Sequence, residues 1–217
     1  MKKQIVLAAF AGAFALCASS AFAANTLAVN AGAALNGTNF GMAITVDPTA
    51  SNPVYVQSDH PTSETHIRLR WRMRFQAQTA PAAGPGRSFR FMNVGDVDSA
   101  ASPHKVFFAQ RQSTTGNWRF AAWSWDTPAN TYVFAGGLFL FSYLAPDDVL
   151  MECESTPATA PGNGVLTCTK VGTAQTFTNS TLNDTSRQTD NVQFGFFDFD
   201  NFNSAGTAHF DEYESYR

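Results

Sequence analysis

In the stretch Thr65-His-Ile-Arg-Leu-Arg-Trp-Arg-Met-Arg-Phe75, every second residue from Ile67 onward is apolar, and arginines fill the positions between. Side chains of a β-strand point alternately to the two faces of its sheet, so the pattern predicts a strand with one face in an apolar core. The opposite face carries four guanidinium groups, which we call the arginine ladder: Arg68, Arg70, Arg72 and Arg74. Such a ladder repels itself unless acids, aromatic rings or a ligand cover it.

Short apolar or alternating runs follow one another from Thr26 to the end of the chain, separated by Gly, Pro, Asn, Asp and Ser. About a dozen strands at this spacing, with no convincing amphipathic helix, predict an all-β fold: an antiparallel β-sandwich or jelly roll. The expected strands span residues 39–47, 54–57, 65–76, 88–94, 105–112, 118–125, 132–135, 138–143, 149–155, 165–171, 191–200 and 207–215.

The first residues have the three parts of a secretory signal peptide. A positive segment, Met1-Lys2-Lys3, precedes an apolar run from Ile5 to Leu16, and Ala21-Phe22-Ala23 supplies small residues for cleavage. The apolar run is shorter than the roughly 20 residues of a membrane-spanning helix. We therefore expect a signal peptide over residues 1–23, one β-sandwich domain over residues 24–217, and a secreted or periplasmic protein without a transmembrane segment.

Loss of the signal would take the formal net charge from −3 to −5, because both of its lysines leave with it. A net acidic chain is a poor nucleic-acid binder, so no nucleic-acid partner is expected. Cys153 and Cys168 would be the two cysteines left, in strand-like runs joined by a Pro- and Gly-rich loop. An even pair in an exported chain predicts a disulfide. The alternative, a metal site or a reactive thiol pair, lacks a CxxC spacing and a nearby histidine.

Stretches near both ends of the chain resemble one protein family. They are Gly41-Met-Ala-Ile-Thr-Val46, Tyr55-Val-Gln-Ser-Asp-His-Pro61, Glu64 with the first arginines of the ladder, and His209-Phe-Asp-Glu-Tyr-Glu-Ser-Tyr-Arg217. Together they resemble the exported bacterial LamG-like domains of the concanavalin A-like lectin and glucanase superfamily. The resemblance implies a jelly-roll fold. It implies no single activity, because that superfamily includes lectins, glycosidases and adhesion modules.

Two acidic pairs, Glu152-Cys-Glu154 and Asp198-Phe-Asp200, each share one face of a predicted strand. A glycosidase needs two carboxylates beside the scissile bond, and either pair has the composition of such a site. The alternative is that these acids neutralise the arginine ladder. The run Glu-x-Asp-x-x-Glu of related glucanases, the Gly-x-Ser-x-Gly elbow and the nucleotide-binding glycine motifs are all absent from the sequence. No catalytic residue is therefore predicted.

Zinc and calcium prefer different ligands, and the sequence offers candidates for calcium. The four histidines are scattered without the spacing of zinc ligands. Calcium prefers carboxylate and carbonyl oxygens, and Asp198, Asp200 and Asp211, near the last two predicted strands, are the candidate ligands of a structural calcium ion. The alternative is an ordinary polar hairpin in which residues 201–206 form the turn. No other cofactor is expected to be required.

Three tryptophans lie on one predicted strand, with Trp123 and Trp125 on the face opposite Trp118. A flat, exposed indole is a surface on which a sugar ring stacks. The alternative is that these rings pack in the core together with many of the 20 phenylalanines.

These patterns favour a non-catalytic extracytoplasmic binding module for a glycan or another cell-envelope polymer. We expect the arginine ladder and an indole, that of Trp123 or Trp125, to form one groove for an acidic or neutral polysaccharide. A second hypothesis is a glycoside hydrolase or polysaccharide lyase with an acidic or arginine site. A third is a structural envelope or matrix protein that assembles with copies of itself.

Overall fold

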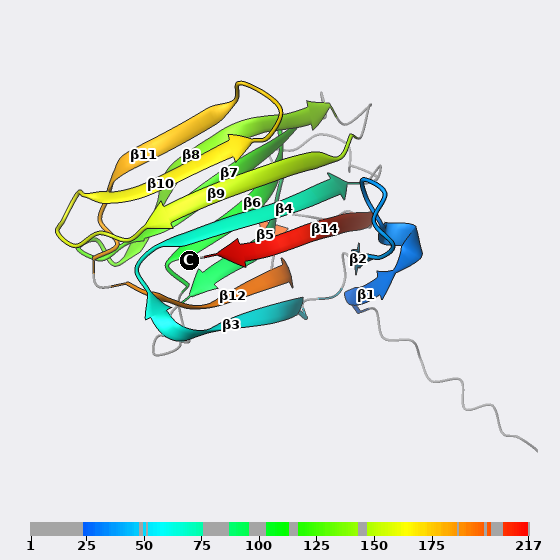
Figure 1. The fold of residues 1–217 in the computed structure, drawn as a ribbon, viewed down its shortest axis with the longest axis horizontal. Coiled ribbons are helices and arrows are strands. Elements are labelled where there is room, and N and C mark those ends of the chain that lie inside the picture. Colours follow the sequence, from blue (N-terminus) through cyan, green and yellow to red (C-terminus); the bar gives the residue numbers. More distant parts are fainter. Residues whose placement is uncertain are drawn as a thin grey trace, which may run out of the picture.

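A computed structural model shows two antiparallel β-sheets packed face to face (Figure 1), which confirms the predicted β-sandwich. The structure describes residues 24–47, 50, 52–75, 87–95, 103–112, 117–142, 147–185, 187–197, 199–200 and 206–216. The predicted signal peptide lies outside these residues. No helix in the described ranges is long and apolar enough to cross a membrane.

Sheet A brings the two ends of the chain together, because the last strand lies between two early ones (Figure 1). Its order is β1 (Thr26–Asn30), β2 (Gly41–Val46), β14 (Gly206–Tyr216), β4 (Ile67–Phe75), β9 (Val149–Thr156), β10 (Gly164–Lys170) and β11 (Thr176–Leu182). A short 3-10 turn, η1 (Ala31–Ala33), follows β1.

Sheet B is formed largely by the middle of the chain. Its order is β3 (Val54–Glu64), β12 (Thr189–Phe196), β5 (Arg87–Gly95), β6 (Lys105–Gln112), β7 (Asn117–Asp126) and β8 (Thr131–Ser142), and the short β13 (Phe199–Asp200) also pairs with β5. Each sheet therefore has an inner face toward the other sheet and an outer face that side chains of opposite parity occupy.

Aromatic rings from both sheets fill the space between them. Trp71 of β4 is fully buried, and its ring centroid lies 5.8 to 6.0 Å from those of three phenylalanines of sheet B, Phe91, Phe107 and Phe120. The other apolar residues of β4 are buried as well. The arginine ladder consequently lies on the outer face of sheet A, as the alternation predicted.

The predicted disulfide is confirmed. Cys153 of β9 and Cys168 of β10 are directly opposite each other in the antiparallel register, and their sulfur atoms are bonded. Both residues are buried on the inner face of sheet A. The bridge therefore ties together two strands that also support the outer face beside the ladder.

The sequence prediction of two separate strands over residues 132–143 was wrong. The break expected at Gly136 and Gly137 is absent, and β8 runs through both residues as one strand. A Cβ atom on Gly136 would lie 2.3 Å from the Phe177 ring of β11. A Cβ atom on Gly137 would lie 2.9 Å from the Arg119 side chain. These glycines make room for neighbouring side chains instead of forming a turn.

Candidate functional site

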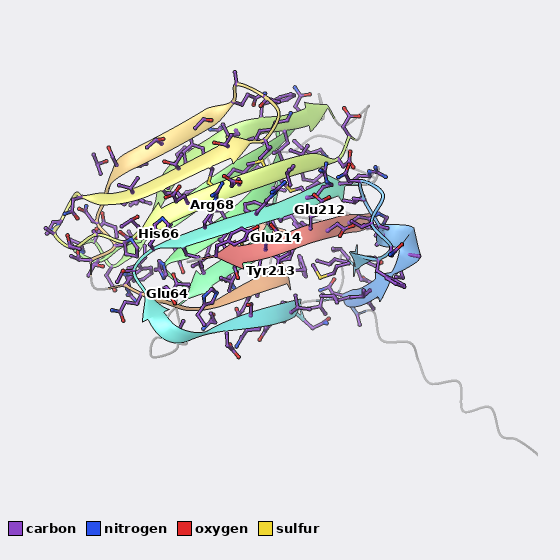
Figure 2. All side chains as sticks on the ribbon, in the orientation of Figure 1. Glu64, His66, Arg68, Glu212, Tyr213 and Glu214 are labelled. Atoms are coloured by element: carbon purple, nitrogen blue, oxygen red, sulfur yellow. A yellow bond between two sulfur atoms is a disulfide. The ribbon has the colours of Figure 1, made fainter. Side chains whose placement is uncertain are left out.

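The arginine ladder is largely neutralised by neighbouring strands. Arg68 pairs with Glu152 of β9 at 2.5 Å, and Nε of Arg72 lies 3.0 Å from Glu212 of β14. Arg74 lies 3.5 Å from Asp148. Figure 2 shows Arg68 on β4 and Glu212 and Glu214 along the adjacent β14. The acids thus hold three strands of sheet A together across their outer face.

A pocket of about 370 Å³ lies over one end of this ladder. Its lining residues are His66, Arg68, Arg70, Glu152, Glu154 and Tyr216. The His66 ring lies 2.7 Å from Glu154, and the Tyr216 hydroxyl donates to Glu214. Arg70 makes no ion pair with any residue in the described part of the chain, although Glu152 and Glu214 face it in register. The pocket is therefore charge-balanced, and it presents no net positive surface.

The predicted groove of ladder and indole is wrong, because the two sets of side chains lie on opposite outer faces of the sandwich. Of the acids expected to cover the ladder, Glu152 does so, whereas Glu154 pairs with a histidine. Asp198 lies outside the described residues, and Asp200 belongs to β13 in sheet B. Two acids that the sequence did not single out pair with two of the other arginines: Glu212 of β14 with Arg72, and Asp148, just before β9, with Arg74.

The candidate calcium ligands are not gathered in the described structure. Asp211 accepts hydrogen bonds from the backbone amide of Leu35, at 2.8 Å, and from the hydroxyl of Thr38. Its carboxylate therefore anchors the loop after η1. No group of three or more metal-binding side chains occurs among the residues that the structure describes. The calcium site stays a prediction.

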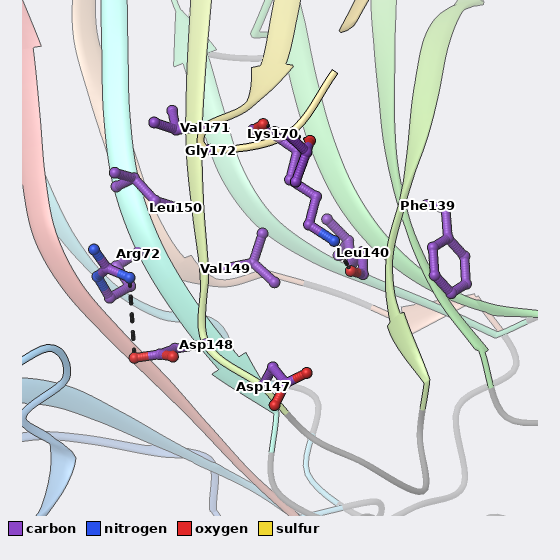
Figure 3. A pocket seen from close by; sticks show the side chains of 11 residues that line it. Arg72, Phe139, Leu140, Asp147, Asp148, Val149, Leu150, Lys170, Val171 and Gly172 are labelled. Carbon is purple, nitrogen blue, oxygen red and sulfur yellow. Dashed lines mark hydrogen bonds and ion pairs between the residues drawn. The ribbon is translucent and has the colours of Figure 1, made fainter. Parts of the chain in front are cut away.

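A second pocket, of about 490 Å³, lies beside β8, β9 and β10 (Figure 3). It contains two acids, Asp147 and Asp148, and two bases, Arg72 and Lys170. Arg72 lies 4.0 Å from Asp148, and the Lys170 ammonium donates to the carbonyl of Leu140. The charges balance here too, and the ammonium is bonded within the protein.

The outer face of sheet B is chemically different, because amide side chains cross three of its strands in one line. We call Asn93 of β5, Gln193 of β12 and Gln57 of β3 the amide row. Asn93 donates to Gln193 at 3.2 Å, and Gln193 donates to Gln57 at 2.9 Å. Arg90 donates to Asn93 at 2.7 Å at one end, and Gln57 donates to Asp59 at 2.6 Å at the other. Asn93 is buried, whereas Gln57 and Gln193 reach the surface, where the second proton of each amide nitrogen can be donated to a ligand.

An aromatic pair stands beside the amide row. The Tyr55 ring stacks on Phe197 with centroids 5.1 Å apart, and the guanidinium carbon of Arg90 lies 5.6 Å from the Phe197 centroid. Tyr55 is 43% exposed. Its hydroxyl has no hydrogen-bond partner within the described ranges. The Tyr55 phenol and the Arg90 guanidinium thus both lie beside the Phe197 ring.

The local sequence explains why these groups meet. Gly195 of β12 is directly opposite Tyr55 of β3, and a Cβ atom there would lie 2.4 Å from the Tyr55 Cα atom. Glycine therefore permits the close approach of the two strands. The Phe197 amide donates to the carbonyl of Arg90 at 3.1 Å, which fixes the ring beside β5.

Trp123 and Trp125 also lie on the outer face of sheet B, and Trp118 is in the core, as predicted. Both outer indoles are half-buried. The Trp123 ring meets Phe134 edge-on at 5.8 Å, and the Trp125 ring meets Tyr132 edge-on at 5.1 Å. Both indoles therefore lie outside the core, and their role as a platform for a sugar stays a prediction.

No protein-family model matches the chain, and no curated protein resembles it in sequence. Solved structures do match its fold. An endo-β-1,4-glucuronan lyase from the fungus Trichoderma reesei has a TM-score of 0.57 and 9% identity, over 88% of this chain and 86% of its own. An alginate lyase from a Chlorella virus has a TM-score of 0.53 and 11% identity, over 88% of both chains.

An alginate lyase from Pseudomonas aeruginosa has a TM-score of 0.50 and 12% identity, over 81% of this chain and 82% of its own. These likenesses cover most of each chain, at low sequence identity. They show that the chain has the jelly-roll β-sandwich fold.

Proposed function

We propose that the protein acts on an acidic polysaccharide as a lyase, with its site on the outer face of sheet B at Tyr55, Arg90 and the amide row. The observation that carries the proposal is the contact of Tyr55 and Arg90 with the same Phe197 ring. On sheet A, by contrast, acids pair with three of the four arginines of the ladder, Arg68, Arg72 and Arg74.

The chemistry of the site fits elimination from a uronic acid. Arg90 and the amide row supply donors that can hold the sugar carboxylate and draw charge from it, which acidifies the neighbouring C5 proton. Tyr55 takes that proton through its phenolic oxygen. The resulting hydroxyl returns a proton to the O4 oxygen as the C4–O4 bond breaks, so the product carries a C4–C5 double bond.

The structural neighbours support this proposal by what they are: two alginate lyases and a glucuronan lyase with the same fold. They shift our preference from binding alone, which the sequence favoured, toward cleavage. Export and the disulfide are compatible with a polymer substrate outside the cytoplasm. Binding without cleavage is the second candidate, and the exposed rings of Phe134 and Phe139 on the same face favour it.

The test uses the folded domain with glucuronan, alginate and polygalacturonate. We expect ultraviolet absorbance from the new double bond with at least one polymer. Tyr55→Phe should abolish the absorbance and leave binding, measured by calorimetry, within about twofold, because only the reacting oxygen is lost. Tyr216→Phe, on the outer face of sheet A, is the matched control and should cleave like the unaltered protein.

Three results would discriminate the hypotheses. Equal loss of cleavage in Tyr55→Phe and Tyr216→Phe would contradict the assignment of the site. Heat of binding without any double-bond product would leave the binding-module function. Neither heat nor product with any of the three polymers would reject an acidic polysaccharide as the substrate.

A further inference from the structure

Arg119 lies on the outer face of sheet B, and no ion pair joins it to a carboxylate among the described residues. The guanidinium carbon of Arg119, on β7, lies 5.3 Å from the centroid of the Phe134 ring of β8. The Trp123 ring meets the same Phe134 ring edge-on. No carboxylate in the described part of the chain pairs with Arg119, in contrast to three arginines of the ladder.

The position of Arg119 is built into the strand beside it. A Cβ atom on Gly137 of β8 would lie 2.9 Å from Nε of Arg119 and 2.5 Å from the Phe120 carbonyl oxygen. The guanidinium therefore lies against a residue that has no side chain, next to an aromatic ring that is 46% exposed. Packing orients the arginine while its donors make no hydrogen bond to any described residue, which suits it to bind an anion.

Arg90 and Arg119 lie against different aromatic rings, Phe197 and Phe134. The two residues are on β7 and β5, with β6 between them, and in register Arg119 faces Gln110, which in turn faces Ser88. Strands are about 4.8 Å apart, so the two arginine backbones are separated by about 10 Å across the sheet, and further along it. A chain of several sugars spans that distance along one face.

We propose that Arg119, with Phe134 and Trp123, forms a second subsite that holds the carboxylate of another acidic sugar on the same polymer. This inference rests on the proposed function, and it names the substrate as an extended polyanion rather than a single uronate. The aromatic rings contact the apolar face of the sugar, and the guanidinium takes its carboxylate through paired hydrogen bonds.

The experiment compares Arg119→Gln with Arg68→Gln, a matched loss of one charge on the opposite face. Calorimetry uses whichever of glucuronan, alginate and polygalacturonate the unaltered protein binds, as polymer and as disaccharide. Arg119→Gln should weaken polymer binding about tenfold, since hydrogen bonds between charged partners contribute on that scale. Arg119→Gln should leave disaccharide binding unchanged, and Arg68→Gln should change the binding of neither polymer nor disaccharide. Circular dichroism checks that both variants are folded.

Two outcomes would overturn the second subsite while the proposed function stands: polymer binding by Arg119→Gln equal to that of the unaltered protein, or an equal loss in Arg68→Gln. A parallel tenfold loss for the disaccharide would place Arg119 in the first subsite and also overturn the inference. Failure of the unaltered protein to bind or cleave any of the polymers would reject both proposals together.

Discussion

His104 is the most unusual titratable residue of the described structure. It is fully buried, and neither ring nitrogen has a hydrogen-bond partner in the described ranges. Burial lowers the pKa of His104 well below its ordinary value, and the nearby cations Lys105 and Arg187 lower it further. Lys105 is itself buried and pairs with Asp184, so its charge is compensated, and the imidazole stays neutral beside it.

This burial predicts a loss of stability in acid. The unfolded chain takes up a proton at His104 near pH 6.5, whereas the folded chain does not, so stability is complete above that pH and falls as pH decreases below it. The slope is at most about 1.4 kcal/mol per pH unit. Urea unfolding between about pH 7 and pH 5 measures it.

His104→Gln should reduce that pH dependence, because it removes the fully buried histidine; His209, whose pKa burial and Arg74 also lower, remains. The surface variant His66→Gln is the control and should retain the dependence of the unaltered protein. An NMR titration of the His104 ring provides a direct check on the folded protein. Protonation of the ring near pH 6.5 without unfolding would contradict the account.

For single residues, the sequence predicted which face of a strand a side chain occupies, but it did not predict which side chains of other strands lie beside it. Alternation correctly placed the ladder on an outer face and the two indoles opposite Trp118. The amide row escaped notice because Asn93, Gln193 and Gln57 lie far apart in the chain, in ordinary alternating strands. They lie in one line only because β12 pairs with β3 and β5 in a particular register. The sequence of one strand does not predict the register in which a neighbouring strand pairs with it.

Between elements, the disulfide gives a direct prediction. Replacing Cys153 and Cys168 with serine should lower the free energy of unfolding by about 3 kcal/mol in the chain-entropy model, for a bridge between residues 15 apart. Denaturant unfolding of the double variant measures this loss. Polysaccharide binding by the folded fraction should persist, because the bridge lies in sheet A and the proposed site lies on sheet B.

Thiol titration of the unaltered, non-reduced protein is the control, and it should detect neither Cys153 nor Cys168 as a free thiol. Two reactive thiols in the folded protein, or a double variant as stable as the parent, would contradict the bridge's role.

The sequence also predicted most strands, but it did not predict the two edge strands of sheet A. The strands β1 and β11 lie at the two edges of sheet A, where one side of the strand is unpaired. Their residues are mostly exposed and include many Thr and Asn, so neither has the apolar alternation of a buried strand. The bulge in β14 was equally unforeseen: Glu212 has a φ of 49° there, and the extra residue lets its carboxylate reach Arg72.

Taken as a whole molecule, the sandwich has two outer faces of different character. Sheet A carries arginines matched by acids, which link its strands. Sheet B carries amides, aromatic rings and the arginines Arg90 and Arg119 against those rings. A net acidic chain can still hold a polyanion on one face, because the local arrangement of donors, and not the total charge, decides where a carboxylate binds.

The central claim is that an acidic polysaccharide binds the outer face of sheet B. The most direct measurement is NMR mapping of backbone amide shifts on titration with a glucuronan or alginate oligosaccharide. The account predicts that the perturbed amides cluster on β3, β5, β7 and β12, around Tyr55, Arg90 and Arg119. Perturbations clustered on β4, β9 and β14, around His66 and Arg68, would contradict it.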